Sequence, residues 1–187
     1  MAGLLLAAGE GRRYGRPKAL VRDEAGVPWL ASAANVLLEG GCRPVVVVLG
    51  ASAAEAETLL PEQPDAVTHV RADGWEEGMG ASLRVGLAAA AELRPHPVAV
   101  LIGLVDTPGV TREVVARVME LASPDVLAQA AYDGRPGHPV LIGRNHWSGV
   151  RDVAVGDRGA RDYLREREVV RVECGDIGDG RDVDLPT

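Results

Sequence analysis

The chain has 187 residues, of which 47% are hydrophobic and 25% are charged, and its formal net charge is −7. This length suits one domain with one buried core, and the acidic balance argues against nucleic acid as a partner, because binding a polyanion relies on basic side chains. Aromatic residues form 3% of the chain, which also disfavours the stacking platforms of proteins that bind single strands.

Strands and helices are predicted to alternate along the first part of the chain. Apolar runs predict strands at residues 2–7, 44–49, 67–70 and 98–104, and the second and fourth runs are so uniformly apolar that both of their faces should be buried. Helical spacing or composition between them predicts helices at residues 28–38, 53–60 and 82–93.

The pattern is looser after residue 106. Thr111 is a predicted N-cap for a helix that reaches about residue 121, with Glu113 in its first turn. Strands near 126–131, 140–142 and 169–173 and a helix near 160–167 complete the prediction. The fold class is therefore α/β, a single domain over residues 1–187 with a Rossmann-like three-layer α/β/α sandwich and a mostly parallel sheet.

The first predicted strand runs into a loop rich in glycine and positive charge, residues 9–18. Gly9, Gly11 and Gly15 let backbone N–H groups turn toward an anion. Lys18 is the only lysine among 20 lysine and arginine residues, which indicates a need for a compact ammonium group. The spacing fits neither the P-loop nor the dinucleotide fingerprint, but the composition predicts a triphosphate site.

Asp106 follows the predicted strand at 98–104. Ligands of open parallel sheets bind at the carboxyl ends of the strands, so Asp106 and the glycine loop should meet at one edge. Mg²⁺ prefers one or two carboxylates together with phosphate oxygens, so Asp106 is a predicted metal ligand. A turn or capping aspartate before Thr107 is the alternative interpretation.

The loop reads Leu-Ala-Ala-Gly-x-Gly-x-Arg-x-Gly-x-Pro-Lys over residues 6–18, and this pattern resembles the signature of nucleotidyltransferases that activate sugars, isoprenoid precursors and molybdopterin. Within that superfamily, whose fold is the nucleotide-diphospho-sugar transferase type, the chain most resembles the molybdenum cofactor cytidylyltransferases. Further segments carry the resemblance in the expected order, at residues 75–83, 104–108, 137–140 and 156–161.

The resemblance implies roles for particular residues. Arg13 and Lys18 would stabilise the triphosphate, and these two residues with Asp106 form the predicted catalytic set. The nucleotide would also meet a set of small or apolar residues in two loops: Leu6, Ala7, Ala8, Gly9, Gly11, Gly78, Gly80 and Ser82. Ser82 could instead be a helix N-cap, and Ala72-Asp73-Gly74 before Trp75 lacks an asparagine that relatives often carry, which leaves the choice of base open.

The tail and the acceptor side complete the implied site. The stretch Asp182-Val183-Asp184-Leu185-Pro186 resembles the family segment that supplies a second metal-facing carboxylate. Alternating side chains of an extended segment point to opposite sides, so only one aspartate can face the metal; we select Asp182 and keep Asp184 in reserve. His138 and Arg158 are predicted to hold the acceptor.

The predicted activity is Mg²⁺-dependent transfer of CMP from CTP to the phosphate of molybdopterin, with release of pyrophosphate; a molybdenum hydroxylase could be the client. Adenylyl or guanylyl transfer is close to this prediction. Two alternatives remain on the same fold: a nicotinamide-dependent oxidoreductase of the nicotine-blue type, and a non-catalytic carrier of the molybdenum cofactor. The two cysteines and the lack of an apolar run of about 20 residues favour a cytoplasmic protein without a membrane span.

Overall fold

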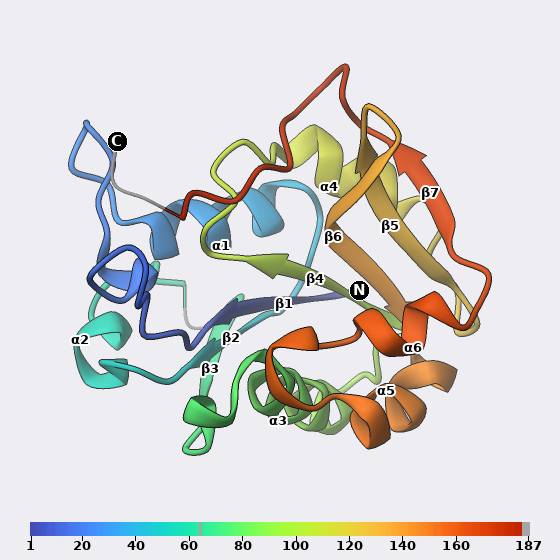
Figure 1. Ribbon diagram of the computed structural model, residues 1–187, viewed down its shortest axis with the longest axis horizontal. Coiled ribbons are helices and arrows are strands. Elements are labelled where there is room, and N and C mark those ends of the chain that lie inside the picture. Colours follow the sequence, from blue (N-terminus) through green and yellow to red (C-terminus); the bar gives the residue numbers. More distant parts are fainter. Residues whose placement is uncertain (64, 185–187) are drawn as a thin grey trace.

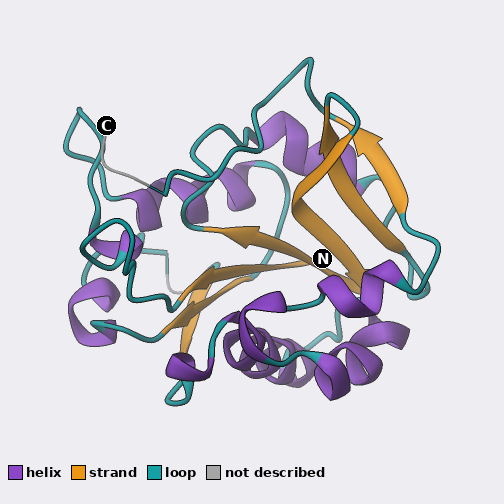
Figure 2. Ribbon diagram, in the orientation of Figure 1, coloured by secondary structure: helices purple, strands orange, loops and turns teal. Residues whose placement is uncertain are grey.

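The computed structural model describes residues 1–63 and 65–184, and these form a three-layer α/β/α sandwich (Figure 1, Figure 2). One seven-stranded sheet has the strand order β3-β2-β1-β4-β6-β5-β7. Strand β6 runs antiparallel to both of its neighbours, and the other neighbouring pairs are parallel. The predicted mostly parallel sheet is therefore confirmed.

The elements of the first part of the chain lie close to their predicted positions. They are β1 (Ala2–Ala7), α1 (Trp29–Glu39), β2 (Val45–Leu49), α2 (Ala53–Glu57), β3 (Val67–Arg71), α3 (Met79–Glu92) and β4 (Ala99–Leu104). Helix α3 begins at Met79, with Gly78 as N-cap, so Ser82 lies inside the helix and its interpretation as an N-cap is wrong. Short 3₁₀ turns at Lys18–Leu20 and Trp75–Glu77 precede α1 and α3.

The part of the chain after residue 106 contains one helix, α5, that the sequence did not predict. The elements of this part are α4 (Arg112–Met119), β5 (Leu127–Tyr132), β6 (Arg135–Gly143), α5 (Trp147–Val153), α6 (Arg161–Arg165) and β7 (Val170–Glu173), with 3₁₀ turns at Arg144–His146 and Gly156–Arg158. The predicted cap of α4 is confirmed, because Thr111 Oγ1 accepts a hydrogen bond from the Val114 N–H. The unpredicted helix is α5, where the buried Trp147 indole donates to the Ile142 carbonyl.

The helices bury both faces of the sheet. Helices α1 and α4 lie on one face and α3, α5 and α6 on the other (Figure 1). Because both faces are covered, every residue of β1 and β2 is buried. Gly86 lets α3 approach the sheet closely, since a Cβ there would lie 2.5 Å from a Leu4 methyl carbon. Within the described residues, no helix combines the length and the apolar character needed to cross a membrane.

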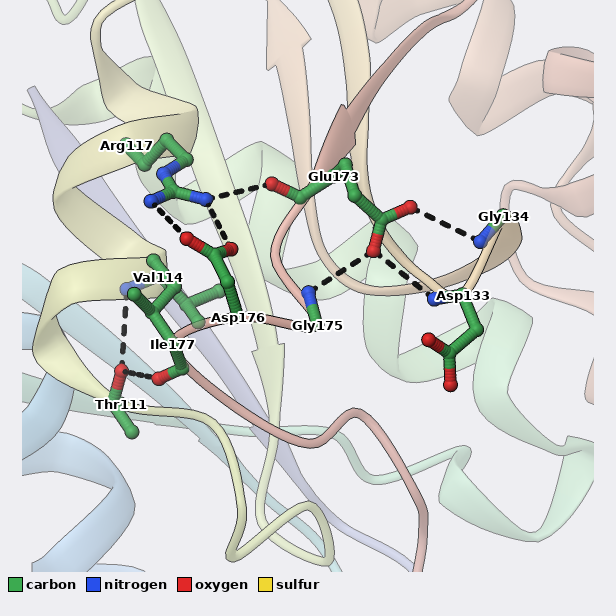
Figure 3. Close-up of polar contacts among 9 residues, drawn as sticks. All are labelled: Thr111, Val114, Arg117, Asp133, Gly134, Glu173, Gly175, Asp176 and Ile177. Atoms are coloured by element: carbon green, nitrogen blue, oxygen red, sulfur yellow. Dashed lines mark hydrogen bonds and ion pairs between the residues drawn. The ribbon is translucent and has the colours of Figure 1, made fainter.

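The segment after β7 is held by side chains of α4, of its N-cap Thr111 and of β7 (Figure 3). Arg117 makes two hydrogen bonds to the Asp176 carboxylate, at 2.6 and 2.9 Å, and Thr111 Oγ1 donates to the Ile177 carbonyl at 2.9 Å. The Glu173 carboxylate accepts three backbone N–H groups, those of Asp133, Gly134 and Gly175.

Farther along, this segment pairs with the loop that follows β4. The Asp179 N–H donates to the Gly109 carbonyl and the Val183 N–H to the Asp106 carbonyl, both at 2.9 Å. The tail aspartates are thereby carried to the carboxyl end of β4.

Replacing Arg117 with alanine removes the ion pair with Asp176 and the hydrogen bond to the Glu173 carbonyl. The ion pair is largely exposed to solvent, so we expect little change in the melting temperature. We expect several-fold faster hydrogen exchange at the Asp179 and Val183 amides, measured by NMR, because the tail opens more often.

Arg112→Ala is the matched control for this experiment, since Arg112 pairs with Glu39 and Glu113 and not with the tail. Equal exchange rates in the two variants would show that Arg117 does not anchor the tail.

Candidate functional site

The glycine loop and Asp106 begin side by side at one edge of the sheet. Strands β1 and β4 are parallel neighbours, with Leu6 opposite Leu104, so both chains leave the sheet in the same direction. The loop then folds back through the 3₁₀ turn at Lys18–Leu20, where Ala19 and Leu20 are buried. These buried side chains fix the place from which Lys18 extends.

Lys18 lies between two carboxylates. Its Nζ atom is 2.8 Å from Asp106 Oδ2 and 3.0 Å from Asp184 Oδ1. Arg13 Nη1 contacts the other oxygen of Asp184 at 2.6 Å. The side chains of Lys18 and Asp106 are 12% and 20% exposed, whereas that of Arg13 is 77% exposed. We call Arg13, Lys18, Asp106 and Asp184 the charged cluster.

Lys18 and Asp184 favour each other's ionised form. Burial acts to lower the pKa of Lys18, but the hydrogen bonds and charges of Asp106 and Asp184 outweigh it and raise that pKa above its usual value. The hydrogen bond from Lys18 is the main cause that lowers the pKa of Asp184. At neutral pH the cluster therefore holds a charged ammonium group beside an ionised carboxylate.

The tail aspartate in the cluster is Asp184, which was the reserve choice from the sequence. Asp182 is exposed and makes no contact with Lys18 among the described residues. The alternation of an extended segment predicts that only one of the two aspartates reaches the site, and the anchoring of the tail decides which one contacts Lys18. Leu185 and Pro186, which belong to the same sequence motif, lie outside the described residues.

The predicted nucleotide-binding residues lie on two neighbouring segments. Leu6, Ala7 and Ala8 are buried at the end of β1, and the exposed Gly9 follows them. Gly50 brings the two segments together, because a Cβ there would lie 2.6 Å from the Ala8 carbonyl oxygen and 2.7 Å from Trp75 Cβ. The start of α3 therefore follows a turn that packs close to the glycine loop.

Gly78 and Gly80 pack against the backbone of the segment between α5 and α6. A Cβ at Gly78 would lie 2.6 Å from the Gly156 carbonyl carbon, and one at Gly80 would lie 2.7 Å from that of Ala154. Gly78 also has a positive φ of 107°. These glycines are required for packing, and their contact with a base remains a prediction.

His138 lies near the charged cluster, on β6 beside β4. Burial lowers the pKa of its imidazole to about 4, although the negative charges of Asp106 and Asp182 oppose the shift. The positive charge of Arg161 adds to the lowering. The ring is therefore neutral at neutral pH. Arg158, the other predicted acceptor residue, is exposed and pairs with Asp162 at 2.8 Å.

Sequence reasoning missed Trp29 and Tyr14. The Tyr14 ring in the glycine loop packs edge-on against Trp29, with ring centroids 5.6 Å apart. With Thr107 and His138, Trp29 lines a cavity of about 270 Å³ beside β4. Trp147, another of the three tryptophans, is buried in the core and does not line this cavity. The aromatic pair places the glycine loop at the edge of this cavity.

The residues present can contribute to a metal site but cannot complete one. Among residues 1–63 and 65–184, no three or more histidine, cysteine, aspartate or glutamate side chains group as a metal cage. Asp106 and Asp184 share one cationic neighbour, Lys18. Two carboxylates suit Mg²⁺, which takes one or two carboxylates together with waters and phosphate oxygens.

Comparison with known proteins gives matches over nearly the whole chain. Residues 3–172 match the family model of the MobA-like NTP transferase domain. A nicotine blue oxidoreductase of Paenarthrobacter nicotinovorans is 38% identical over 196 aligned residues, covering 98% of this chain and 92% of that protein. A molybdenum cofactor guanylyltransferase of Rhodobacter capsulatus is 30% identical over 181 aligned residues, covering 95% and 82%.

Solved structures show the same fold. The crystal structure of Rv0371c from Mycobacterium tuberculosis H37Rv has a TM-score of 0.80 and 24% identity, covering 98% of this chain and 92% of that one. A structure of Rv0371c with manganese has a TM-score of 0.74 and 21% identity, with coverages of 92% and 86%. The fold, the glycine loop and the matches in sequence agree, and the chain belongs to the MobA-like NTP transferase domain family.

Proposed function

We propose that this protein is a Mg²⁺-dependent nucleotidyltransferase that transfers CMP from CTP to the phosphate of molybdopterin and releases pyrophosphate. The observation that carries the proposal is the charged cluster, in which Lys18 Nζ lies 2.8 Å from Asp106 and 3.0 Å from Asp184. A relative named as a molybdenum cofactor guanylyltransferase supports the acceptor and makes GTP the second nucleotide to test.

Each member of the charged cluster has a role in this reaction. Lys18 and the exposed Arg13 bind the phosphates and stabilise the charge that develops on them. Asp106 and Asp184 would hold the metal ion, which supplies charge neutralisation at the triphosphate when bound. An oxygen of the acceptor phosphate attacks the α-phosphorus, and the bond to the bridging oxygen breaks as pyrophosphate leaves. The attacking phosphate oxygen is already deprotonated, so no general base is needed.

Ligand binding must rearrange the cluster. Lys18 now neutralises both carboxylates, and a triphosphate would compete with them for its ammonium group. Asp106 and Asp184 would hold a divalent cation, which would supply the positive charge that Lys18 withdraws. Metal and triphosphate should therefore bind more tightly together than either does alone.

An oxidoreductase is the second candidate function. The relative at 38% identity, which covers 98% of this chain, is named as a nicotine blue oxidoreductase. A nicotinamide dinucleotide could use Arg13 and Lys18 for its phosphates, but it would not need Asp106 and Asp184 as metal ligands. Metal dependence of binding therefore separates the two functions.

Changing the carboxylates tests the metal assignment. We expect Asp106→Asn and Asp184→Asn each to lower Mg²⁺-dependent pyrophosphate release, with CTP and molybdopterin as substrates, by about 100-fold or more, because each removes a full charge at the reacting phosphates. Asp182→Asn is the control and should have a much smaller effect, since among the described residues Lys18 contacts Asp106 and Asp184 and not Asp182. Unchanged release in Asp106→Asn would exclude this residue as a metal ligand.

Calorimetric titration of CTP, GTP, ATP and NADPH, with and without Mg²⁺, tests the ligand class. We expect metal-dependent triphosphate binding that weakens about tenfold or more in Lys18→Ala. Lys18→Arg should not restore it, because the Lys18 side chain is only 12% exposed and a planar guanidinium is larger. Tight NADPH binding without metal would instead establish the oxidoreductase.

A further inference from the structure

Tyr132, the last residue of β5, contacts two segments from different parts of the chain. It is half-buried and packs against the core on the α1 face of the sheet. Its hydroxyl donates a hydrogen bond of 2.8 Å to the His138 carbonyl on β6. Its ring lies against Gly180 in the tail. Tyr132 therefore contacts both the strand that carries His138 and the segment that carries Asp184.

The ring of Tyr132 explains why position 180 is a glycine. A Cβ at Gly180 would overlap Cδ2 and Cε2 of the ring and would lie 2.9 Å from its Cζ. Gly180 is not one of the glycines with a positive φ, so its backbone conformation would accept other residues. Gly137 on β6 meets the same edge of the ring, since a Cβ there would lie 3.0 Å from both Cδ2 and Cε2. Both glycines therefore make room for the ring.

Gly180 lies between two backbone contacts that fix the course of the tail. Before it, the Asp179 N–H donates to a carbonyl of the loop after β4 at 2.9 Å. After it, the Val183 N–H donates to the Asp106 carbonyl, also at 2.9 Å, and Asp184 follows. The contact with the ring thus comes immediately before the part of the tail that enters the charged cluster.

The hairpin that carries Tyr132 is also tied to the start of the tail. Its two turn residues, Asp133 and Gly134, have positive φ values of 52° and 74°, as tight hairpin turns of this kind require. The Glu173 carboxylate accepts the N–H groups of both turn residues at 3.0 Å (Figure 3). The hairpin and the tail are therefore joined at two places, the turn and the ring, and the hairpin gives the ring a fixed base.

The hydroxyl of Tyr132 acts on the other side of the site. His138, which is predicted to hold the acceptor, lines the cavity beside β4. Among the side chains of residues 1–63 and 65–184, that of Tyr132 is the one that donates to the His138 carbonyl. Burial is the main cause that raises the pKa of Tyr132, so the hydroxyl keeps its proton and remains a donor.

We propose that Tyr132 is a positioning residue for the nucleotidyl transfer: its hydroxyl sets the place of His138, and its ring sets the place of the tail that brings Asp184 to Lys18. This role rests on the proposed function and adds to it a residue outside the charged cluster. Tyr132 acts through two different neighbours, so its hydroxyl and its ring can be tested separately.

Tyr132→Phe tests the hydroxyl, because it keeps the ring against Gly180. We expect the KM for molybdopterin to rise about fivefold or more, while the KM for CTP and the Mg²⁺ concentration for half-maximal pyrophosphate release change less than about twofold. The ring signals of His138 in NMR spectra should shift without any substrate. Tyr163→Phe is the matched control, since its hydroxyl also has one partner, the His146 ring at 3.0 Å, and it should leave the KM values and the His138 signals unchanged.

Gly180→Ala tests the ring, because the added methyl group would collide with it and displace the tail. We expect the Mg²⁺ concentration for half-maximal release to rise about fivefold or more, with little change in the KM for molybdopterin. The Val183 amide should exchange its hydrogen faster, because its bond to Asp106 opens more often. In Tyr132→Ala, which lacks the ring, adding Gly180→Ala should cause no further rise in the Mg²⁺ requirement.

Two results would overturn the role of Tyr132. One is an unchanged KM for molybdopterin together with unchanged His138 signals in Tyr132→Phe, which would assign the hydroxyl to packing alone even if the melting temperature fell. The other is an equal effect of Gly180→Ala with and without the ring. If the native protein releases no pyrophosphate, the transferase is refuted, whereas a shift of the His138 signals in Tyr132→Phe and faster Val183 exchange in Gly180→Ala would still support the positions that Tyr132 sets.

Discussion

One partly buried ammonium group joins three distant parts of this chain. Lys18 follows β1, Asp106 follows β4 and Asp184 lies in the tail, and their contacts of 2.8 and 3.0 Å hold the three together. Desolvation acts against the charge of Lys18, so the ammonium depends on the carboxylates. The carboxylates in turn would repel each other without a cation between them. The loop, the strand end and the tail therefore meet around one balance of charge.

Because the charges of the cluster neutralise one another, a charged ligand must replace contacts within the cluster when it binds. Each carboxylate and each cation of the charged cluster is satisfied by another member, so a polyanion or a divalent cation can enter only by exchanging partners. Such exchange links the binding of the two ligands thermodynamically. The exposed side chain of Arg13 can move at little cost, whereas Lys18 and Asp106, which are only 12% and 20% exposed, define the fixed part of the site.

Strand β4 contributes to both halves of the core and ends beside an apolar cavity and the charged cluster. Leu101 and Val105 belong to the core on the α1 face, and Val100 and Ile102 to the core on the α3 face, as the alternation of a strand requires. Gly103 interrupts the α1 face and leaves the apolar cavity there, and Asp106 follows at the strand end. A largely apolar region and a charged region thus adjoin at the end of β4.

Local patterns in the sequence predicted the buried strands of the first part of the chain, the cap at Thr111, and the meeting of the glycine loop with Asp106 at one edge of the sheet. Helix α5 was missed, since it has only seven residues and is stabilised by burial of Trp147 and Val150 in the core. The alternation at Asp182 and Asp184 implied opposite directions but not which aspartate faces Lys18. Only the tertiary structure decided that Asp184 contacts Lys18, because the position of the tail depends on the contacts of Arg117 and Thr111, which are far from it in sequence. The cavity beside β4 likewise depends on residues from distant parts of the chain.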